Sequence, residues 1–244
     1  MARKLSIMDS GWLMMETRET PMHVGGLALF AVPEDAPSDY MESVYRYMVE
    51  VDGVCRPFSQ KIQSRLPGRL DAAWVDDKNF DIDYHVRHSA LPRPGRVREL
   101  LALVSRLHAQ RLDPSRPLWE SYLIEGLEGN RFALYTKMHH SMVDGMAGMH
   151  LMQSRMASSA DERLPAPWSG EWDQRKKPRK KNVAVAAKAS VLEGMGSARR
   201  GAGQLVDLLR LPKESNVKTI YRAPKTQLNC RVTGARRFAA QSWS

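Results

Sequence analysis

Two strand-like segments that run into a histidine pair constrain the fold of this chain most strongly. Residues 118–127 (LWESYLIEGL) and 131–139 (RFALYTKMH) are separated by a three-residue turn, which predicts a hairpin or a pair of neighbouring strands. The second segment continues directly into HHSMVDG, and residues 146–157 read as a helix. The sequence therefore predicts a polar site where a central strand of an α/β domain ends and a helix begins.

Hydrophobic periodicity predicts the remaining elements. Gly25 and Gly26, at the start of one apolar run, either allow a close approach of the backbone or form a strand-entry turn. Apolar residues at helical spacing predict helices, whereas alternation or a short apolar run predicts a strand. The strands expected in this way are 25–32, 69–75 and 80–86, and the helices are 39–51 and 95–111.

The histidine pair His139-His140 is the candidate reactive group. A neutral imidazole can take a proton from a hydroxyl group near neutral pH, and such general-base help contributes about 10²–10⁴ in rate. Asp144, four residues after His140, either orients that ring as in a catalytic triad or fixes the loop by pairing with an arginine elsewhere. Gly145 removes a side chain beside the site, so that the backbone bends or a substrate approaches.

The histidine pair has two other interpretations. A histidine at a strand end is more often structural than catalytic. The pair could also bind a metal together with an aspartate, with His108 or His150 completing the set. No HExxH or CxxC pattern accompanies it, and adjacent residues of a strand point to opposite faces. We therefore favour a general base and expect no metal.

The net charge of +10 belongs to the C-terminal part of the chain. Residues 1–170 contain 20 Lys and Arg against 22 Asp and Glu, whereas residues 171–244 contain 17 against 5. This distribution argues against binding of nucleic acid by the folded body. The run RKKPRKK is either a solvated linker or an attachment to anionic lipid, with about 1 kcal/mol from each basic residue near the surface. Its six basic residues are Arg175, Lys176, Lys177, Arg179, Lys180 and Lys181.

Cysteine usage and the lack of a targeting pattern suggest a compartment. Cys55 and Cys230 are far apart and form no CxxC pattern, so we interpret them as reduced thiols in a cytosolic protein. The N-terminal residues lack the pattern of a signal peptide, and no window approaches 18 uncharged apolar residues.

Several segments, taken together, resemble a known family. HHSMVDG matches HHxxxDG, the signature of acyltransferases of the chloramphenicol-acetyltransferase-like superfamily. The chain is similar to the bacterial wax ester synthase/acyl-CoA:diacylglycerol acyltransferase family over nearly its whole length, apart from the basic linker. HHxxxDG alone is moderately specific, whereas all these segments in this order are strongly so. The matching segments are LSIMDSGWLMMETRETPMHVGGLALF, FDIDYHVRHSALPRPG, SRPLWESYLIEGLEGNRFALYTKMHHSMVDG and PKTQLNCRVTGARRFA.

The resemblance implies the domain organisation. It implies an α/β, chloramphenicol-acetyltransferase-like two-layer domain with a mixed β-sheet and flanking helices. Residues 1–160 would form the N-terminal acyltransferase domain, 161–222 a basic, partly helical linker, and 223–244 the start of a second, similar domain. The family's Asn-Asp motif, expected in that second domain, is absent from this sequence. We therefore expect the isolated chain to be inactive without a C-terminal half.

The resemblance also implies roles for single residues. His140 would be the general base that deprotonates the acceptor hydroxyl, which then attacks the acyl-CoA thioester without a covalent acyl-enzyme. Asp144 would hold the motif loop in place of the triad role considered above, and His139 would support the site. The motif made of Pro117, Leu118, Trp119 and Glu120 would pack and position rather than react.

The expected activity is therefore O-acyl transfer from acyl-CoA, which is a substrate, so that no cofactor is expected. The acceptor would be a long-chain alcohol, giving a wax ester, or diacylglycerol, giving triacylglycerol. Other expected partners are the C-terminal half and the surface of a membrane or lipid droplet. The expected location is cytoplasmic, on the inner face of the membrane or on lipid inclusions. The alternatives are a condensation-type domain with a carrier-bound acyl donor and a non-catalytic module that binds lipid surfaces.

Overall fold

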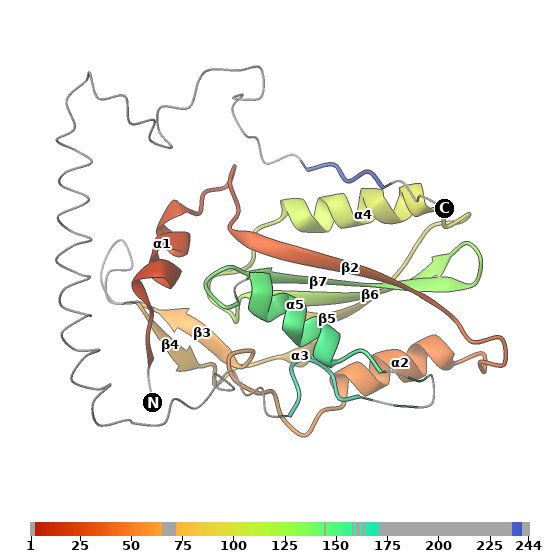
Figure 1. Cartoon of the computed structure of the whole chain (residues 1–244), viewed down its shortest axis with the longest axis horizontal. Coiled ribbons are helices and arrows are strands. Elements are labelled where there is room, and N and C mark those ends of the chain that lie inside the picture. The colour runs from red at the N-terminus through yellow and green to blue at the C-terminus, as the bar shows by residue number, and fades with distance from the viewer. Residues whose placement is uncertain are drawn as a thin grey trace, which may run out of the picture. The chain divides into compact units, whose positions relative to one another are not determined.

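In the computed structural model, the described residues all belong to one compact unit within residues 1–172 and 232–244 (Figure 1). The domain boundaries expected from the sequence therefore stay a prediction. The structure describes residues 3–64, 72–143, 145–157, 159, 162, 164–170 and 236–240.

A four-stranded mixed sheet forms the centre of this unit. Its order is β2 (His23–Ala31), β7 (Arg131–His139), β6 (Trp119–Leu127) and β5 (Val86–Ala90). β5 is parallel to β6, whereas β2, β7 and β6 pair in an antiparallel way. The expected mixed sheet and the neighbouring strands β6 and β7 are thus confirmed. β7 is paired along both edges, so the histidine motif follows a central strand.

Helices cover both faces of this sheet. α4 (Val97–Ala109) lies on one face, and α2 (Tyr40–Val49) and α5 (Gly145–Ser154) lie on the other (Figure 1). The expected α/β fold with a mixed sheet and flanking helices is confirmed. α4 packs on its face of the sheet through an amphipathic stripe that buries Leu100 and Val104.

The alternation along β6 explains how both faces acquire a core. Trp119 and Leu123 point to the face covered by α2 and α5, whereas Tyr122 and Ile124 point to the face covered by α4. Both sets are buried. The opposite phase of these residues is the signal that the sequence carried for a strand buried on both sides.

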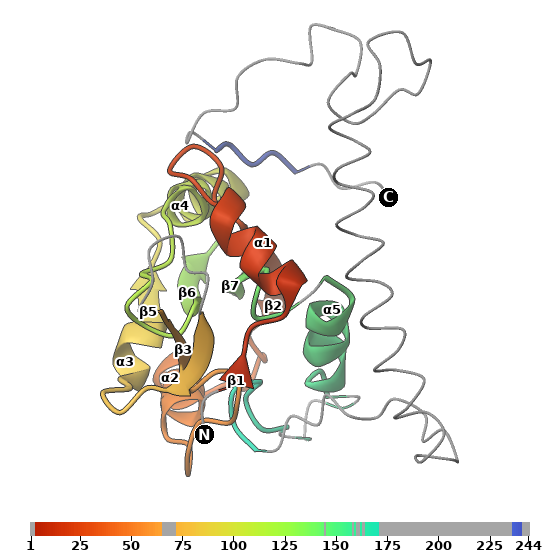
Figure 2. The same ribbon diagram turned by 90° about the vertical axis from the view of Figure 1, so that its left-hand side faces the viewer.

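A smaller sheet and helix α1 lie at one end of the unit. The strands β1 (Arg3–Lys4), β4 (Ala73–Asp76) and β3 (Gln60–Gln63) pair in this order, all antiparallel. α1 (Ile7–Met15) follows β1 and begins with a capping box, in which the side chains and backbone amides of the two capping residues bond to one another. Figure 2 shows α1 passing across the end of the main sheet at which β7 ends.

One expected strand is wrong. Residues 80–86 alternate in apolar character, yet α3 (Ile82–His85) is a short helix and the strand β5 begins only at Val86. The side chain of Asp81 accepts a hydrogen bond from the backbone of Asp83 and caps this turn. His85 is then stacked between Phe80 and Trp119, a contact that a straight strand would not make.

The other expected elements agree more closely with the structure. The strand at 25–32 and the helices at 39–51, 95–111 and 146–157 are confirmed as β2, α2, α4 and α5. The strand expected at 69–75 coincides with β4 only over its last residues, and residues 65–71 lie outside the described part of the chain.

Gly25 meets a steric requirement that its neighbour Gly26 does not. A Cβ atom at Gly25 would lie 2.7 Å from the hydroxyl oxygen of Tyr135 and 3.1 Å from Nδ1 of His108. These two atoms share a hydrogen bond of 2.7 Å beneath β2. A Cβ at Gly26 would meet nothing within 4 Å. The close-approach interpretation therefore holds for Gly25 alone.

We predict that Gly25→Ala destabilises the fold by about 1–3 kcal/mol, because the new methyl group must displace the bonded hydroxyl of a buried tyrosine. Gly26→Ala is the matched control and should change the free energy of unfolding by less than about 1 kcal/mol. Denaturant titration of both variants measures the difference. Equal stability of the two variants would contradict the close packing described here.

Candidate active site

The histidine pair lies in a turn that ties the end of β7 to the entry of β2. The backbone N–H of His140 donates a hydrogen bond of 2.9 Å to the carbonyl of Met22. The N–H of Met142 donates to the carbonyl of His139, also at 2.9 Å, and closes the turn. Gly145 is the first residue of α5, and Asp144 lies outside the described residues. The motif backbone is thus held by hydrogen bonds on either side of the pair.

His139 is buried, with an exposed fraction of 1%, and its ring orientation is fixed. The backbone N–H of Ser141 donates a hydrogen bond of 3.0 Å to Nδ1, and the hydroxyl of Ser141 lies 2.7 Å from the same atom. Because Nδ1 accepts, the neutral ring carries its proton on Nε2. That atom lies 3.8 Å from Oε1 of Glu16. The side chain of His139 is therefore engaged within the fold.

Glu16 supplies a negative charge beneath His139. Its side chain is almost completely buried and accepts a hydrogen bond of 2.8 Å from Arg111. Burial alone would raise the pKa of Glu16. The hydrogen bond from Arg111 and the electrostatic interactions with His139 and Arg111 outweigh burial and hold that pKa below its ordinary value. The carboxylate is consequently ionised and favours the Nε2–H of His139 on its side.

His140 is only partly buried, and helix α1 holds its ring from the other side. The indole of Trp12 stacks on the imidazole, with ring centroids 4.6 Å apart and planes inclined by 18°. Trp12 and Glu16 are four residues apart and therefore lie on the same side of the helical turn. One face of this N-terminal segment thus contacts both histidines. The π face of an indole favours a cation, so this stack suits a ring that becomes imidazolium.

Neither Trp12 nor Glu16 was identified as a site residue from the sequence. The available signal was their spacing of four residues where α1 ends, with Trp12 in the helix and Glu16 as its C-cap. That spacing alone does not say which part of the fold the helix contacts.

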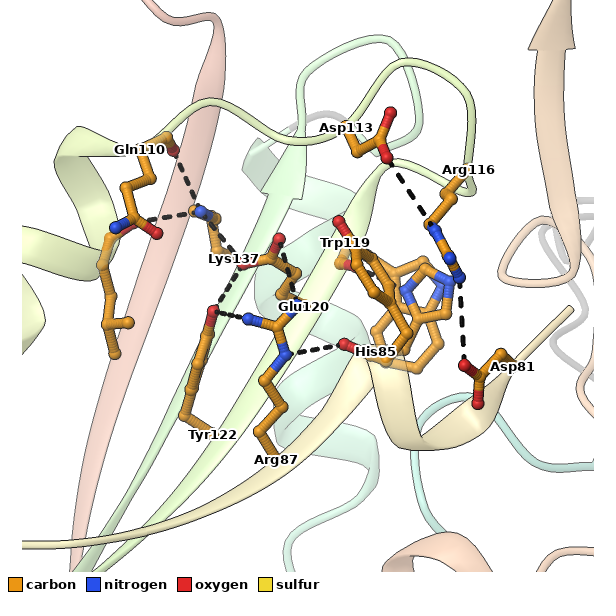
Figure 3. Close-up of polar contacts among 12 residues, drawn as sticks. Asp81, His85, Arg87, Gln110, Asp113, Arg116, Trp119, Glu120, Tyr122 and Lys137 are labelled. Carbon is orange, nitrogen blue, oxygen red and sulfur yellow. Dashed lines mark hydrogen bonds and ion pairs between the residues drawn. The ribbon is translucent and has the colours of Figure 1, made fainter.

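A buried ion pair lies two residues before the histidine pair (Figure 3). Nζ of Lys137 is 3.1 Å from Oε2 of Glu120, and it donates hydrogen bonds of 3.0 Å to the carbonyls of Leu107 and Gln110. The lysine side chain has no exposed surface. Burial lowers the pKa of Lys137, while the charge of Glu120 raises it. The lysine joins β7 to β6 and to the C-terminal end of α4.

Glu120 has further partners (Figure 3). The hydroxyl of Tyr122 donates a hydrogen bond of 2.7 Å to Oε2, and Arg87 donates one of 3.0 Å to that hydroxyl. Burial, together with this bond to the Glu120 carboxylate, raises the pKa of Tyr122 above its ordinary value. The carboxylate of Glu120 therefore finds its hydrogen-bond and ion-pair partners within the fold.

The rest of the Pro117-Leu118-Trp119-Glu120 motif contacts the turn and the core. The carbonyl of Leu118 accepts a hydrogen bond of 3.0 Å from the backbone N–H of His139. Trp119 is completely buried, and its Nε1–H donates to the carbonyl of Phe58 at 2.8 Å. The N–H of Trp119 donates to the carbonyl of Pro117. These contacts are those of a packing element beside the histidine turn.

Two neighbouring histidines are engaged in the fold. Nε2 of His23, which is paired with His139 in the sheet, donates a hydrogen bond of 2.8 Å to the carbonyl of His108. Burial lowers the pKa of His23 to about 4, so this ring is neutral near pH 7. Among the described residues, no group of three or more His, Cys, Asp or Glu side chains is placed to hold a metal ion. The helices in this part of the chain also lack the length and apolar character of a membrane span. The basic run 175–181 lies outside the described residues.

We predict that Lys137→Met destabilises the fold by about 3–5 kcal/mol, because it leaves the carboxylate of Glu120 buried beside fewer partners. Arg46→Met removes one member of an exposed pair with Glu42 and should cost at most about 1 kcal/mol. Urea titration of the two variants measures both values. A small loss for Lys137→Met, similar to that of Arg46→Met, would show that the buried pair does not support the strand.

The chain is similar to a family of known acyltransferases. It matches the family model described as wax ester synthase/diacylglycerol acyltransferase catalytic domain over residues 5–244. A putative diacylglycerol O-acyltransferase of Mycobacterium tuberculosis is 40% identical over 245 residues, which cover 98% of this chain and 53% of that protein. The O-acyltransferase WSD of Acinetobacter baylyi is 36% identical over 249 residues, covering 99% of this chain and 52% of that protein.

A solved structure agrees with these sequence matches. The wax ester synthase/diacylglycerol acyltransferase from Marinobacter aquaeolei VT8 has a TM-score of 0.72 and 38% sequence identity, and the match covers 98% of this chain and 52% of that chain. The chain spans about half the length of the curated relatives it matches. The resemblance of its motifs is confirmed: this chain belongs to the wax ester synthase/diacylglycerol acyltransferase family.

Proposed function

We propose that the chain carries the hydroxyl-activating part of an O-acyltransferase, which transfers a fatty acyl group from acyl-CoA to a long-chain alcohol or to diacylglycerol. Family membership supports the reaction class. The names of the relatives support both acceptors, since they include diacylglycerol O-acyltransferases and a wax ester synthase. The observation that carries the proposal is the partly exposed ring of His140 at the end of the central strand.

In the proposed reaction His140 is the general base. Its ring nitrogen takes the proton of the acceptor hydroxyl while the hydroxyl oxygen forms a bond to the thioester carbonyl carbon. The carbon–sulfur bond then breaks, and the departing thiolate takes the proton from the imidazolium. The products are an ester and free CoA, and the histidine returns to its neutral form. No acyl group is attached to the protein at any step.

The contacts of the two histidines support this choice of base. Nδ1 of His139 accepts from the backbone of Ser141, and its Nε2 faces Glu16 inside the fold. The backbone N–H of His140 donates a hydrogen bond to the carbonyl of Met22, and its ring stacks on Trp12. We assign His139 a supporting role, and we keep for Asp144 the role of holding the motif loop.

A hydroxyl-activating base is one part of such a site. Groups that polarise the thioester oxygen contribute about 10²–10³ in rate in acyl-transfer enzymes. The relatives extend well beyond the length matched here. We propose that a C-terminal half of the kind found in the relatives supplies the group that polarises the thioester oxygen.

We predict that His140→Ala lowers the rate of ester formation by about 10²–10⁴. The chain should be fused to the C-terminal half of a relative and given palmitoyl-CoA with hexadecanol or dipalmitoylglycerol, with ester and free CoA measured together. His150→Ala changes an exposed histidine of α5 and should leave the rate unaltered.

An unchanged rate with His140→Ala would refute the assignment of the base. Trapping of an acyl group on the protein would refute the direct transfer. Ester formation only from a carrier-bound acyl donor would favour the condensation-type alternative, and absence of any product would favour a non-catalytic lipid-binding module.

For the basic run 175–181 we propose attachment to an anionic lipid surface, which would place the protein at the inner face of the membrane or on lipid inclusions. Replacing its six Lys and Arg residues by Gln should abolish most binding to vesicles that contain phosphatidylglycerol, because each basic residue near the surface contributes about 1 kcal/mol. A sedimentation assay measures this loss, and neutral phosphatidylcholine vesicles are the control. Undiminished binding to anionic vesicles would instead indicate that the run is a solvated linker.

A further inference from the structure

A groove of about 810 Å³ runs between α4 and the extended residues 236–240. Its apolar surface includes Leu101, Ala102 and Phe238, the last with 41% of its surface exposed. The backbone N–H of Phe238 donates a hydrogen bond of 2.9 Å to the hydroxyl of Ser105 and so anchors the segment to the helix. The volume falls in the range typical of sites for small molecules.

Three arginines on the rim of this groove make no ion pair within the described residues. Arg98 and Arg106 are exposed, eight residues apart on α4, and lie on the same helical face as Leu101 and Ala102. Arg237 is exposed on the opposite rim. The neighbouring Arg236 differs, because it donates a hydrogen bond of 3.1 Å to the carbonyl of Glu19.

The combination of an apolar floor and uncompensated guanidinium groups defines the chemistry of a ligand. Exposed guanidinium groups along one groove create a positive potential that attracts an anion. Guanidinium groups match the oxygen geometry of phosphate and bind it with two parallel hydrogen bonds. The apolar floor suits an uncharged arm attached to that phosphate. The groove therefore fits an organic phosphate ester better than a free inorganic anion.

A short series of contacts leads from this groove to the histidine turn. The ring of Phe238 meets the edge of His108, with centroids 5.2 Å apart. The carbonyl of His108 accepts the hydrogen bond of His23, which faces His139 across the β2–β7 pair. These contacts link the edge of the groove to the strand pair that precedes His140.

We propose that this groove binds the phosphate-bearing end of the acyl donor, with Arg98, Arg106 and Arg237 as phosphate ligands. This assignment rests on the proposed function, because it identifies the phosphate ester as that of acyl-CoA. The same chemistry is offered by the headgroup of an anionic phospholipid, and the test below separates the two sources.

Binding of CoA to the 244-residue chain by isothermal titration calorimetry tests the assignment. The triple variant Arg98→Gln/Arg106→Gln/Arg237→Gln should bind CoA at least about tenfold more weakly, because hydrogen bonds to charged groups contribute strongly to binding. The matched control Arg3→Gln/Lys4→Gln/Lys78→Gln removes three exposed positive charges elsewhere and should bind CoA as the unaltered chain does. Inorganic phosphate should bind far more weakly than CoA.

Several results would overturn the assignment. These are no binding of CoA to the unaltered chain, an equal loss in both triple variants, and a loss in neither. Binding to vesicles that contain phosphatidic acid, lost in the groove variant while CoA binding is unchanged, would assign the groove to a lipid headgroup instead. His140→Ala should retain CoA binding, so failure of the groove and failure of the proposed base give different results.

Discussion

The pairing of β7 with a neighbour on each side is the constraint on which the candidate site depends. Backbone hydrogen bonds to β2 and β6 fix His139 opposite His23 and beside Leu118. The side-chain alternation of a strand then directs Lys137 and His139 to the face covered by α4. The chain leaves the strand at His140, so this residue is the first whose side chain the sheet no longer encloses. The different surroundings of two identical neighbours follow from the place where the strand ends.

The buried pair Lys137–Glu120 strengthens that constraint by making other registers costly. Removing two charges from water is unfavourable, and the pair is tolerated because each charge has several partners at close range. A slip of β7 by one residue would turn Lys137 to the opposite face, beside Trp119 and Leu123 of β6, where the structure offers an apolar core. An unpaired ammonium group there would destabilise the fold by about several kcal/mol, as other buried unpaired charges do. The ion pair thus selects the register that places the histidines.

The sequence was sufficient for the parts of this arrangement that depend on local pattern. The strands β6 and β7 and the amphipathic helix α4 were expected because their periodicity extends over many residues. The position of the motif between a central strand and α5 followed from the same pattern. The strand expected at residues 80–86 is wrong because one side-chain cap and the stacking of His85 outweigh a short hydrophobic alternation.

The surroundings of the histidines could not be predicted in the same way. Glu16 meets Arg111 across 95 positions of sequence, and Trp12 meets His140 across still more. Such contacts form only when the whole sheet is assembled, and no local sequence spacing predicts them. The motif indicated the family and, through the family, His140 as the expected base, whereas the groups that hold the two rings came from the structure.

The most direct test of His140 as the reacting group is chemical modification of the folded chain, read histidine by histidine. Diethyl pyrocarbonate acylates accessible neutral imidazole rings, and peptide mass mapping locates each modified residue. The proposed role predicts rapid modification of His140, protection of that residue by hexadecanol, and no modification of His139 while the fold is intact. Modification of His139 as fast as that of His140, or an absence of protection by the alcohol, would contradict it.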